Sequence, residues 1–224
     1  TLFMESLYNS DQKLLCVAVD YRDKQNVVDT IELLGKNGIK VFKIHCDIIN
    51  NFDDTFIETL KELKTRLNIV LWEDRKFSDI GFITEQQLHY GVHKISSWAD
   101  IVTFHSTCGS GSIPLLKGID IFLVIELSVD NHLCDENYIK KSIDIANTHP
   151  NIKGVVCQHF PEDLNPKILK IVPGISLSGN TSDHQNQRYN TTGDKSFADI
   201  FVVGRTVTNS PDPIKTIKEI QSNI

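Results

Sequence analysis

The sequence predicts an α/β fold, a (β/α)8 TIM barrel that occupies residues 1–224 as a single domain. Eight short apolar runs rich in β-branched residues recur along the chain at a spacing of ~26 residues, and amphipathic helical patterns separate several of them. Each run is continuous rather than alternating, which is typical of parallel strands covered on both faces. No linker or low-complexity block divides the chain. A doubly wound open sheet remains the alternative, because spacing alone does not show whether a sheet closes.

The expected strands are four to seven residues long. The first is followed directly by Asp20, and the third leads into a charged segment that begins at Glu73. In chain order the eight runs are Leu14–Val19, Val41–Cys46, Ile69–Trp72, Ile101–His105, Ile121–Leu127, Gly154–Cys157, Ile171–Ile175 and Ile200–Val203.

Four segments have the period of an amphipathic helix. The acidic pair Asp53 and Asp54 precedes the second of them and favours a helix N-terminus there. We expect Ser210 to cap the last helix, with Pro211 in its first turn. The expected helices cover Val27–Leu34, Phe56–Leu67, Tyr138–Ala146 and Ile214–Ile220.

The charge of the chain limits the class of partner. The 23 Lys and Arg residues against 29 Asp and Glu residues give a formal net charge of −6. Nucleic acids and anionic membranes are bound by clustered basic side chains, and the sequence has no basic block, so we expect neither partner. The longest apolar run, Leu14–Val19, is far shorter than the ~18 residues of a membrane span. Small-molecule enzymes remain, including those with a phosphorylated substrate.

The cysteines and the N-terminus indicate a compartment. Five cysteines form no CxxC pair, and Cys16, Cys46 and Cys157 lie in strand-like runs, where a free thiol acts as a small apolar side chain. No basic stretch followed by an apolar core marks a secretory signal. We therefore expect a reduced, cytoplasmic protein. The sequence begins at Thr1 without Met, which permits a longer natural chain.

Charged residues collect where the first three expected strands end, which is the face of a (β/α)8 barrel where catalytic groups lie. Strand alternation puts Asp74 and Lys76 on the same side of the third run. A buried lysine also needs a carboxylate partner in a purely structural ion-pair network, which is the alternative interpretation. The residues in question are Asp20, Lys43, His45, Asp74, Lys76 and Asp79, the last three at a D-x-K-x-x-D spacing.

Two segments near the C-terminus favour a phosphate site. Gly204 and Arg205 end the eighth run, where glycine allows a close backbone approach and arginine offers a bidentate fork. Barrels commonly bind phosphate after strands seven and eight. Residues 176–196 contain only Leu177 and Tyr189 as large apolar or aromatic side chains, so we expect a lid or binding loop. The alternatives are a surface arginine and a solvated loop.

Six segments of the chain carry a recognisable pattern. In chain order they are LCVAVD (15–20), KIHCDIINNF (43–52), WEDRKFSDIG (72–81), SSWADIVTFH (96–105), VPGI (172–175) and VVGR (202–205). With these segments the chain resembles orotidine 5′-phosphate decarboxylase, nearer the eukaryotic branch, from about residue 14 to the last helix. The D-x-K-x-x-D spacing alone would also admit relatives such as 3-keto-L-gulonate 6-phosphate decarboxylase, and residues 129–136 match no segment of the family.

The resemblance implies roles for individual residues. Lys43, Asp74, Lys76 and Asp79 match the catalytic charged array, and the residue matched by Asp79 reaches into the other subunit of a homodimer, together with its neighbours Ile80 and Thr84. Lys76 is the expected proton donor. Asp20 and Lys43 match ribose contacts, Ser128 a pyrimidine contact, Pro173 the lining of the base, and Gln187, Tyr189, Gly204 and Arg205 phosphate contacts; His45 lies beside the ribose pair.

The implied reaction is the cofactor-independent decarboxylation of orotidine 5′-monophosphate to UMP and CO2, the last step of de novo pyrimidine nucleotide synthesis. No metal site is expected, because His105 with Cys108 and His45 with Cys46 lack a second pair at ligand spacing. A metal-dependent sugar-phosphate decarboxylase or aldolase-type barrel is one alternative, and a non-catalytic pyrimidine-nucleotide-binding protein is another. In many eukaryotes the domain is fused to orotate phosphoribosyltransferase, and the start at Thr1 permits such a fusion here.

Overall fold

The computed structural model describes residues 7–8, 12–113, 116–178 and 187–224. Eight parallel strands follow one another in chain order around a closed barrel, and the eighth strand pairs with the first. This closure confirms the (β/α)8 barrel and excludes the open sheet. The strands are β1 (Leu14–Ala18), β2 (Val41–Ile44), β3 (Val70–Phe77), β4 (Ile101–His105), β5 (Asp120–Val124), β6 (Ile152–Val156), β7 (Leu169–Val172) and β8 (Ile200–Val203).

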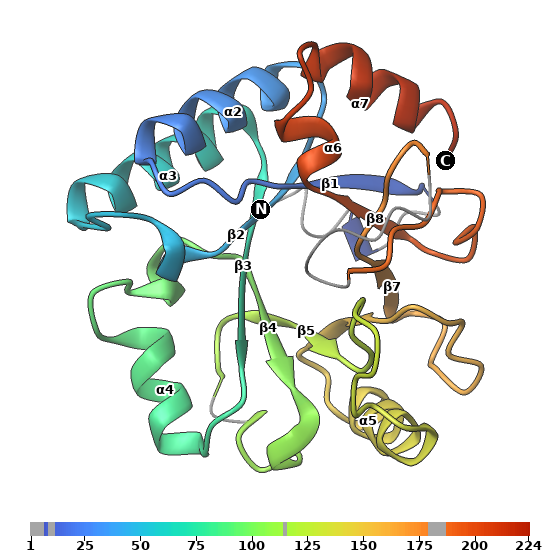
Figure 1. Ribbon diagram of the computed structural model, residues 1–224. Helices are drawn as coiled ribbons and strands as arrows, with labels where there is room; N and C mark the ends of the chain where they lie inside the picture. The colour runs from blue at the N-terminus through green and yellow to red at the C-terminus, as the bar shows by residue number, and fades with distance from the viewer. Residues whose placement is uncertain (1–6, 9–11, 114–115, 179–186) are drawn as a thin grey trace.

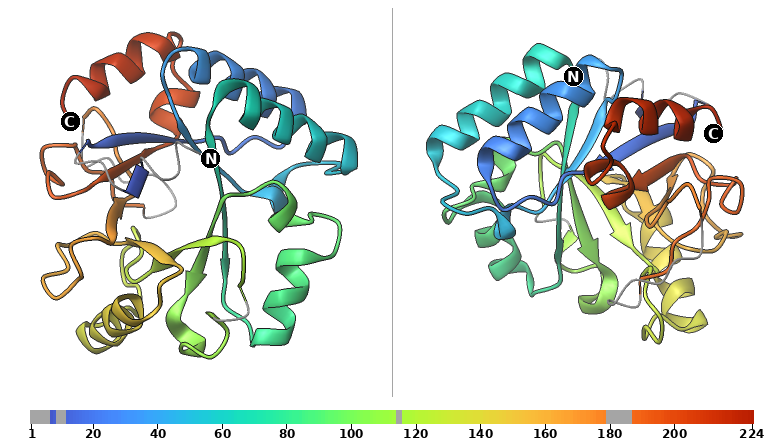
Figure 2. Two further views of the ribbon diagram at one scale, coloured as in Figure 1. Left: turned by 180° about the vertical axis from the view of Figure 1, so that it is seen from behind. Right: turned by 45° about the horizontal axis from the view of Figure 1, so that its top comes forward.

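Helices surround the barrel (Figures 1 and 2). In the connection between β6 and β7, all of which the structure describes, there is no helix. None of the helices in the described ranges combines the length and apolar character needed to cross a lipid bilayer. The helices are α2 (Lys24–Lys36), η1 (Cys46–Ile48), α3 (Asp54–Leu67), α4 (Gly81–His89), η2 (Ile95–Ser97), η3 (Ser106–Cys108), α5 (Glu136–Thr148), α6 (Arg205–Thr208) and α7 (Pro213–Gln221).

Alternate side chains of the strands fill two apolar layers, as the period of two requires. Trp72 and Phe122 fill the barrel interior, with ring centroids 5.1 Å apart in an edge-to-face arrangement. The outward side chains, such as Phe42, Leu71 and Phe201, are fully buried in the layer shared with the helices. The interior layer closes the barrel below its carboxyl end, so polar side chains at that end lie on a packed floor.

Aspartate caps the N-termini of α2, α3, α5 and α7. Asp23, Asp53, Asp135 and Asp212 each accept a backbone N–H of the first turn of α2, α3, α5 and α7. The acidic start expected at Asp53 is thus confirmed. The cap expected at Ser210 is wrong, because α7 begins two residues later, with Asp212 as the cap and Pro213 in the first turn. Ser210 Oγ instead accepts the Asp212 N–H, which supports the turn before the helix.

Strand β3 is longer than the sequence indicates, because it continues through the charged segment to Phe77. Its register with β4 shifts between Glu73 and Phe77, and Lys76 adopts the left-handed conformation with φ 57°. Simple alternation therefore does not hold as far as Lys76. The bulge, rather than a regular strand, turns this residue back toward the side of the barrel that Asp74 faces.

Candidate active site

The charged residues at the carboxyl end of the barrel meet around Asp74. Its Oδ2 accepts hydrogen bonds from Lys43 Nζ at 2.7 Å and Lys76 Nζ at 2.8 Å, and lies 3.2 Å from His45 Nε2. The Lys43 side chain is 10% exposed and that of Lys76 is 32% exposed. The cluster therefore contains a buried lysine, Lys43, and a second lysine, Lys76, that is partly exposed.

His45 connects this cluster to Asp20, which follows β1. His45 Nδ1 lies 2.8 Å from Asp20 Oδ1, so the imidazole bridges the two carboxylates. Asp20 is half exposed, whereas Asp74 is buried. Residues from three consecutive strands thus form one hydrogen-bonded chain, in which Asp20 offers a carboxylate to solvent.

The partners in the cluster favour the charged forms of Asp74, Lys43 and His45. Burial raises the pKa of Asp74, but Lys43, His45 and Lys76 outweigh this effect and hold the pKa well below its usual range. Burial lowers the pKa of Lys43, yet Asp74 and Asp20 outweigh it and raise the pKa. The pKa of His45 is raised too, because its hydrogen bonds to Asp20 and Asp74 outweigh burial. The cluster is a preorganised array of opposite charges.

Thr103 on β4 belongs to this cluster, although the sequence analysis did not select it. Its Oγ1 donates to Asp74 Oδ1 at 2.8 Å and accepts the backbone N–H of Lys76 at 3.0 Å. The sequence signal was one polar residue in phase with Ile101, which faces the barrel interior. That signal marks an inward polar side chain but does not identify its partners.

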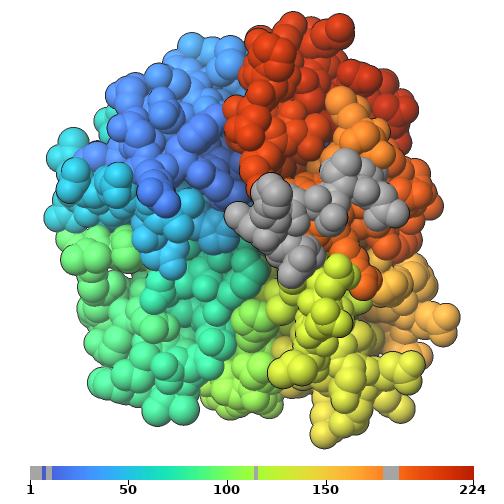
Figure 3. All heavy atoms as spheres, viewed as in Figure 1, coloured from blue at the N-terminus to red at the C-terminus, as the bar shows by residue number. Residues whose placement is uncertain are grey.

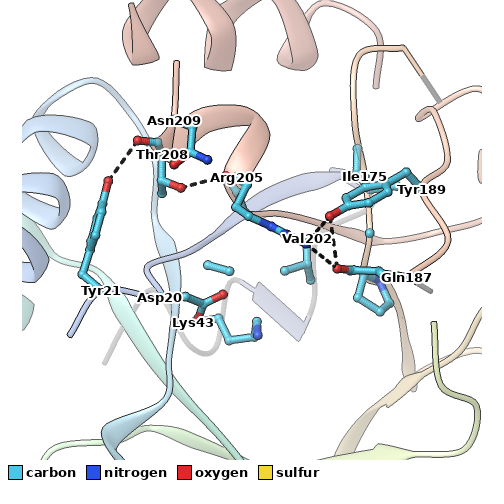
Figure 4. A pocket seen from close by; sticks show the side chains of 14 residues that line it. Asp20, Tyr21, Lys43, Ile175, Gln187, Tyr189, Val202, Arg205, Thr208 and Asn209 are labelled. Carbon is cyan, nitrogen blue, oxygen red and sulfur yellow. Dashed lines mark hydrogen bonds between the residues drawn. The ribbon is translucent and has the colours of Figure 1, made fainter. Parts of the chain in front are cut away.

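A cavity of about 440 Å³ lies next to the cluster. The charged side chains that line it are Asp20, Lys43 and Arg205 (Figure 4). Their formal sum is one positive charge, which suits an anionic ligand. Pro173 and Gly204 also line the cavity, as do Tyr21, Thr208 and Asn209, which the sequence analysis did not select.

Arg205 marks the end of the cavity away from Asp74. Its Nη2 donates to Gln187 Oε1 at 3.1 Å and to the Tyr189 hydroxyl, and the Tyr189 hydroxyl lies 3.2 Å from Gln187 Oε1. Arg205 begins α6 directly after β8, whereas Gln187 and Tyr189 come from the connection between β7 and β8. The three side chains expected at a phosphate therefore lie together. Residues 179–186 of the expected lid lie outside the described residues.

Gly174 explains how the segment 187–190 comes so close to β7. This glycine has φ 77°, and a Cβ built on it would lie 2.5 Å from the carbonyl oxygen of Arg188. Its own carbonyl accepts the Asn190 N–H at 2.8 Å. A side chain at position 174 would displace the strand-like segment that carries Gln187 and Tyr189.

Ser128 and the first residues of the unmatched stretch 129–136 contact the same 187–190 stretch. Arg188 N–H donates to the Ser128 carbonyl at 3.0 Å, and Val129 forms an antiparallel bridge with Gln187. The Arg188 guanidinium pairs with Asp130. We call these contacts of residues 128–130 with 187–188 the clasp. In Figure 3, yellow atoms from the connection after β5 lie next to orange atoms from the connection between β7 and β8.

Other expected site residues lie apart from the cluster within one chain. Asp79 is exposed before α4, where its Oδ1 accepts the Ile80 N–H and its carbonyl accepts the Thr84 hydroxyl. Ile80 is 65% exposed and Thr84 is buried. Ser128, which belongs to the clasp through its carbonyl, is half-buried and is not among the residues lining the cavity. Of the expected residues, the structure brings together Asp20, Lys43, His45, Asp74 and Lys76, and separately Gln187, Tyr189, Gly204 and Arg205.

A family model described as orotidine 5′-phosphate decarboxylase / HUMPS family matches residues 13–220. The chain belongs to this family. The predicted resemblance to orotidine 5′-phosphate decarboxylase is thus confirmed.

Curated relatives in this family come from fungi and animals. The chain is 34% identical over 217 residues to the orotidine 5′-phosphate decarboxylase of Saccharomycopsis fibuligera, covering 89% of this chain and 81% of the relative. It is 30% identical over 213 residues to the uridine 5′-monophosphate synthase of Bos taurus, covering 91% of this chain but 44% of that protein. The chain therefore spans less than half of the bovine relative.

Solved structures of the family have the same fold. The crystal structure of orotidine 5′-phosphate decarboxylase from Pyrococcus horikoshii superposes with a TM-score of 0.74 at 21% identity, covering 94% of this chain and 99% of that one. At this identity the likeness supports the barrel architecture alone.

Proposed function

We propose that the chain decarboxylates orotidine 5′-monophosphate to UMP and CO2 without a cofactor, as the last step of de novo pyrimidine nucleotide synthesis. The observation that carries the proposal is the cluster in which Lys43, Lys76 and His45 surround Asp74, next to a cavity whose far end holds Arg205. Family membership supports the same substrate.

In the proposed reaction the bond between C6 of the pyrimidine and its carboxylate breaks, and the electron pair stays on C6. The Lys76 ammonium stabilises this developing charge and transfers a proton to C6, while CO2 leaves. Solvent then reprotonates the Lys76 amine. Lys76 suits this role because its ammonium is held by Asp74 yet remains partly exposed.

The electrostatic contribution of Lys76 is large but does not account for the whole acceleration that this reaction needs. One ion pair at ~4 Å and an effective dielectric constant of ~20 contributes about 4 kcal/mol. At 1.36 kcal/mol per decade this corresponds to about three orders of magnitude in rate. In this proposal, exclusion of water and the binding of the phosphate by Arg205, Gln187 and Tyr189 supply much of the remainder of kcat/KM.

The other site residues have binding roles in this proposal. Asp20 and Lys43 contact the ribose, with His45 between Asp20 and Asp74. Ser128 and Pro173 contact the pyrimidine, and Gly204 offers its backbone to the phosphate. The positive sum of the charged lining residues supports the binding of an anionic nucleotide.

We also propose a homodimer in which Asp79, Ile80 and Thr84 complete the partner's site. Support comes from the exposed apolar side chains on and beside α4, since Ile80 and Phe82 are each 65% exposed. Mixing two inactive variants, Lys76→Ala and Asp79→Asn, tests this proposal. Exchange of subunits should restore about a quarter of wild-type activity. About half of the dimers are then mixed, and each mixed dimer has one intact site out of two. No recovery after subunit exchange would contradict it.

The cellular context follows from two further observations. All five cysteines are free, which supports a reducing compartment such as the cytoplasm. The match to 44% of the bovine synthase supports the fusion to orotate phosphoribosyltransferase as a prediction, and the mass of the native chain decides it.

The test of the reaction is the loss of absorbance of orotidine 5′-monophosphate in buffer that contains EDTA. Turnover under these conditions is the expected result, and its absence would refute the proposal. If the protein is instead a metal-dependent sugar-phosphate decarboxylase, it should act on a sugar phosphate, and EDTA should abolish this activity. The non-catalytic alternative predicts binding of UMP without turnover.

A further inference from the structure

The Thr103 hydroxyl lies between the two residues on which the proposed reaction most depends. Thr103 is fully buried on β4, and its Oγ1 is 2.8 Å from Asp74 Oδ1 and 3.0 Å from the backbone nitrogen of Lys76. The Lys76 N–H can only donate, so the single proton of the hydroxyl goes to Asp74 and a lone pair accepts from Lys76. Both capacities of the hydroxyl are used.

The two oxygens of Asp74 have different partners. Lys43, Lys76 and His45 all contact Oδ2, whereas Thr103 donates to Oδ1. The two oxygens of a carboxylate are chemically equivalent, and its last torsion has a broad preference. The Thr103 hydroxyl removes this freedom, because it holds one oxygen and leaves the other for the three cationic groups.

The same hydroxyl supports the backbone of Lys76. The register shift between Glu73 and Phe77 takes Lys76 out of the regular ladder, and its left-handed conformation leaves its N–H without a strand acceptor. Thr103 Oγ1 accepts this N–H in place of a backbone carbonyl. One side chain therefore fixes the carboxylate that holds the Lys76 ammonium and the backbone from which the lysine extends.

We propose that Thr103 is a positioning residue for this reaction, which sets the rotation of Asp74 and the backbone of Lys76 so that the ammonium faces the reacting carbon. The inference rests on the proposed decarboxylation. Thr103 has no exposed surface with which to contact substrate, so it acts through its two partners. Its removal should slow the chemical step more than it weakens substrate binding.

The test compares Thr103→Val, which keeps the shape and removes the hydroxyl, with Thr103→Ser, which keeps the hydroxyl. Single-turnover rates and KM for orotidine 5′-monophosphate are measured for both. We expect Thr103→Val to lose roughly 10- to 100-fold in rate with KM changed less than about 3-fold, and Thr103→Ser to retain most of the rate.

A matched control is Thr216→Val. Thr216 is a buried threonine on α7, and its hydroxyl also has two partners, the Asp212 carbonyl and Ser210 Oγ. It should retain the full rate. Should Thr103→Val fail to fold, Thr103→Ala and Thr103→Ser form a second pair that differs only in the hydroxyl.

Three results would overturn the inference while leaving the proposed function intact: a folded Thr103→Val with a rate within about 2-fold of wild type, a Thr103→Ser as slow as Thr103→Val, or an equal loss in Thr216→Val. Wild-type protein that does not decarboxylate the substrate would refute the proposed function itself, and the inference with it.

Discussion

The two ends of the cavity beside the charged cluster are built in different ways. At the Asp74 end, residues on or just after four consecutive strands bond to one another, and the central carboxylate is buried. At the Arg205 end, an exposed arginine on a four-residue helix bonds to two side chains from a long connection. The geometry of the first end is fixed by the barrel itself. The second depends on how the connection is held in place.

This difference has an energetic consequence. Removing one partner from a buried charge pair leaves an uncompensated charge and costs about 3–5 kcal/mol, whereas an exposed pair contributes about 0–1 kcal/mol. Variants at the Asp74 end should therefore lose catalysis and stability. Variants at the Arg205 end should lose affinity with little loss of stability.

The largest effect is expected for Lys76→Ala. It removes the proton donor as well as about 4 kcal/mol of electrostatic stabilisation, so the turnover rate should fall by at least about 10³-fold. Absorbance assays with orotidine 5′-monophosphate measure the turnover rate, and a thermal melt measures the change in stability. Lys61→Ala, at an exposed lysine paired with Glu58, is the control and should be fully active. A Lys76→Ala variant that retains near-full rate would refute the proton-donor role.

The next largest effect is expected for Arg205→Ala. Loss of a charge-assisted bidentate contact to phosphate should lower kcat/KM by roughly 10²-fold, mainly through KM, with the melting temperature within about 2 °C of wild type. Steady-state kinetics provide the measurement, with Arg66→Ala as the control at another exposed, paired arginine. An equal loss in the rate at saturating substrate, without a rise in KM, would show that this end acts on the chemical step instead.

A smaller effect is expected when the ion pair of the clasp is removed. Arg188→Ala removes the pair with Asp130 but leaves the backbone bonds of the 187–190 segment, so KM should rise about 2- to 5-fold. A double-mutant cycle with Asp130→Ala measures the coupling. Additive effects of the two variants would mean that the pair does not hold the segment. A loss as large as that of Arg205→Ala would mean that Arg188 itself contacts substrate.

The smallest effect on turnover is expected for Glu73→Gln. Glu73 precedes Asp74 on β3 and points to the opposite face of the strand, so we expect it to affect stability rather than the Asp74 cluster. Burial raises the pKa of Glu73 to about 8, in contrast to that of Asp74, because Glu73 has no lysine beside it. The folded state thus holds a proton that the unfolded state releases above its ordinary pKa of 4.5. The unfolding free energy contributed by Glu73 is therefore fully present below that pKa and is lost as the pH rises toward 8.

Urea unfolding at about pH 5 and about pH 8.5 measures this contribution. Wild type should lose a few kcal/mol relative to Glu73→Gln between the two conditions. The raised pKa of His45 has the same sign, but it is common to both proteins and cancels in their difference. Parallel pH profiles of the two proteins would contradict the prediction.

The sequence predicted the barrel well because its signal is repeated. Eight apolar runs and the acidic helix starts are local patterns, and each run overlaps a strand of the structure. Asp74, Lys43 and Arg205 could be selected because charge at the end of an apolar strand is costly without a partner. These inferences depend on composition within a few residues.

The remaining features depend on contacts between distant segments. Thr103 meets Lys76 only because a bulge in β3 frees a backbone N–H, and no local pattern marks that bulge. Arg188 and Asp130 are 58 residues apart, so the clasp has no sequence signature either. The cap of α7 was misplaced because Ser210 and Asp212 are both good caps and each is followed by a proline, so the local sequence does not separate them.

The left-handed backbone conformation of Lys76 lowers the stability of the folded chain. A residue other than glycine or asparagine costs about 1–2 kcal/mol in this conformation, and here that residue is Lys76, the proposed proton donor. Optimising this chain for melting temperature alone would therefore favour glycine at position 76, and the more robust protein would be inactive. Directed evolution for thermostability in this scaffold should be screened for turnover at every round.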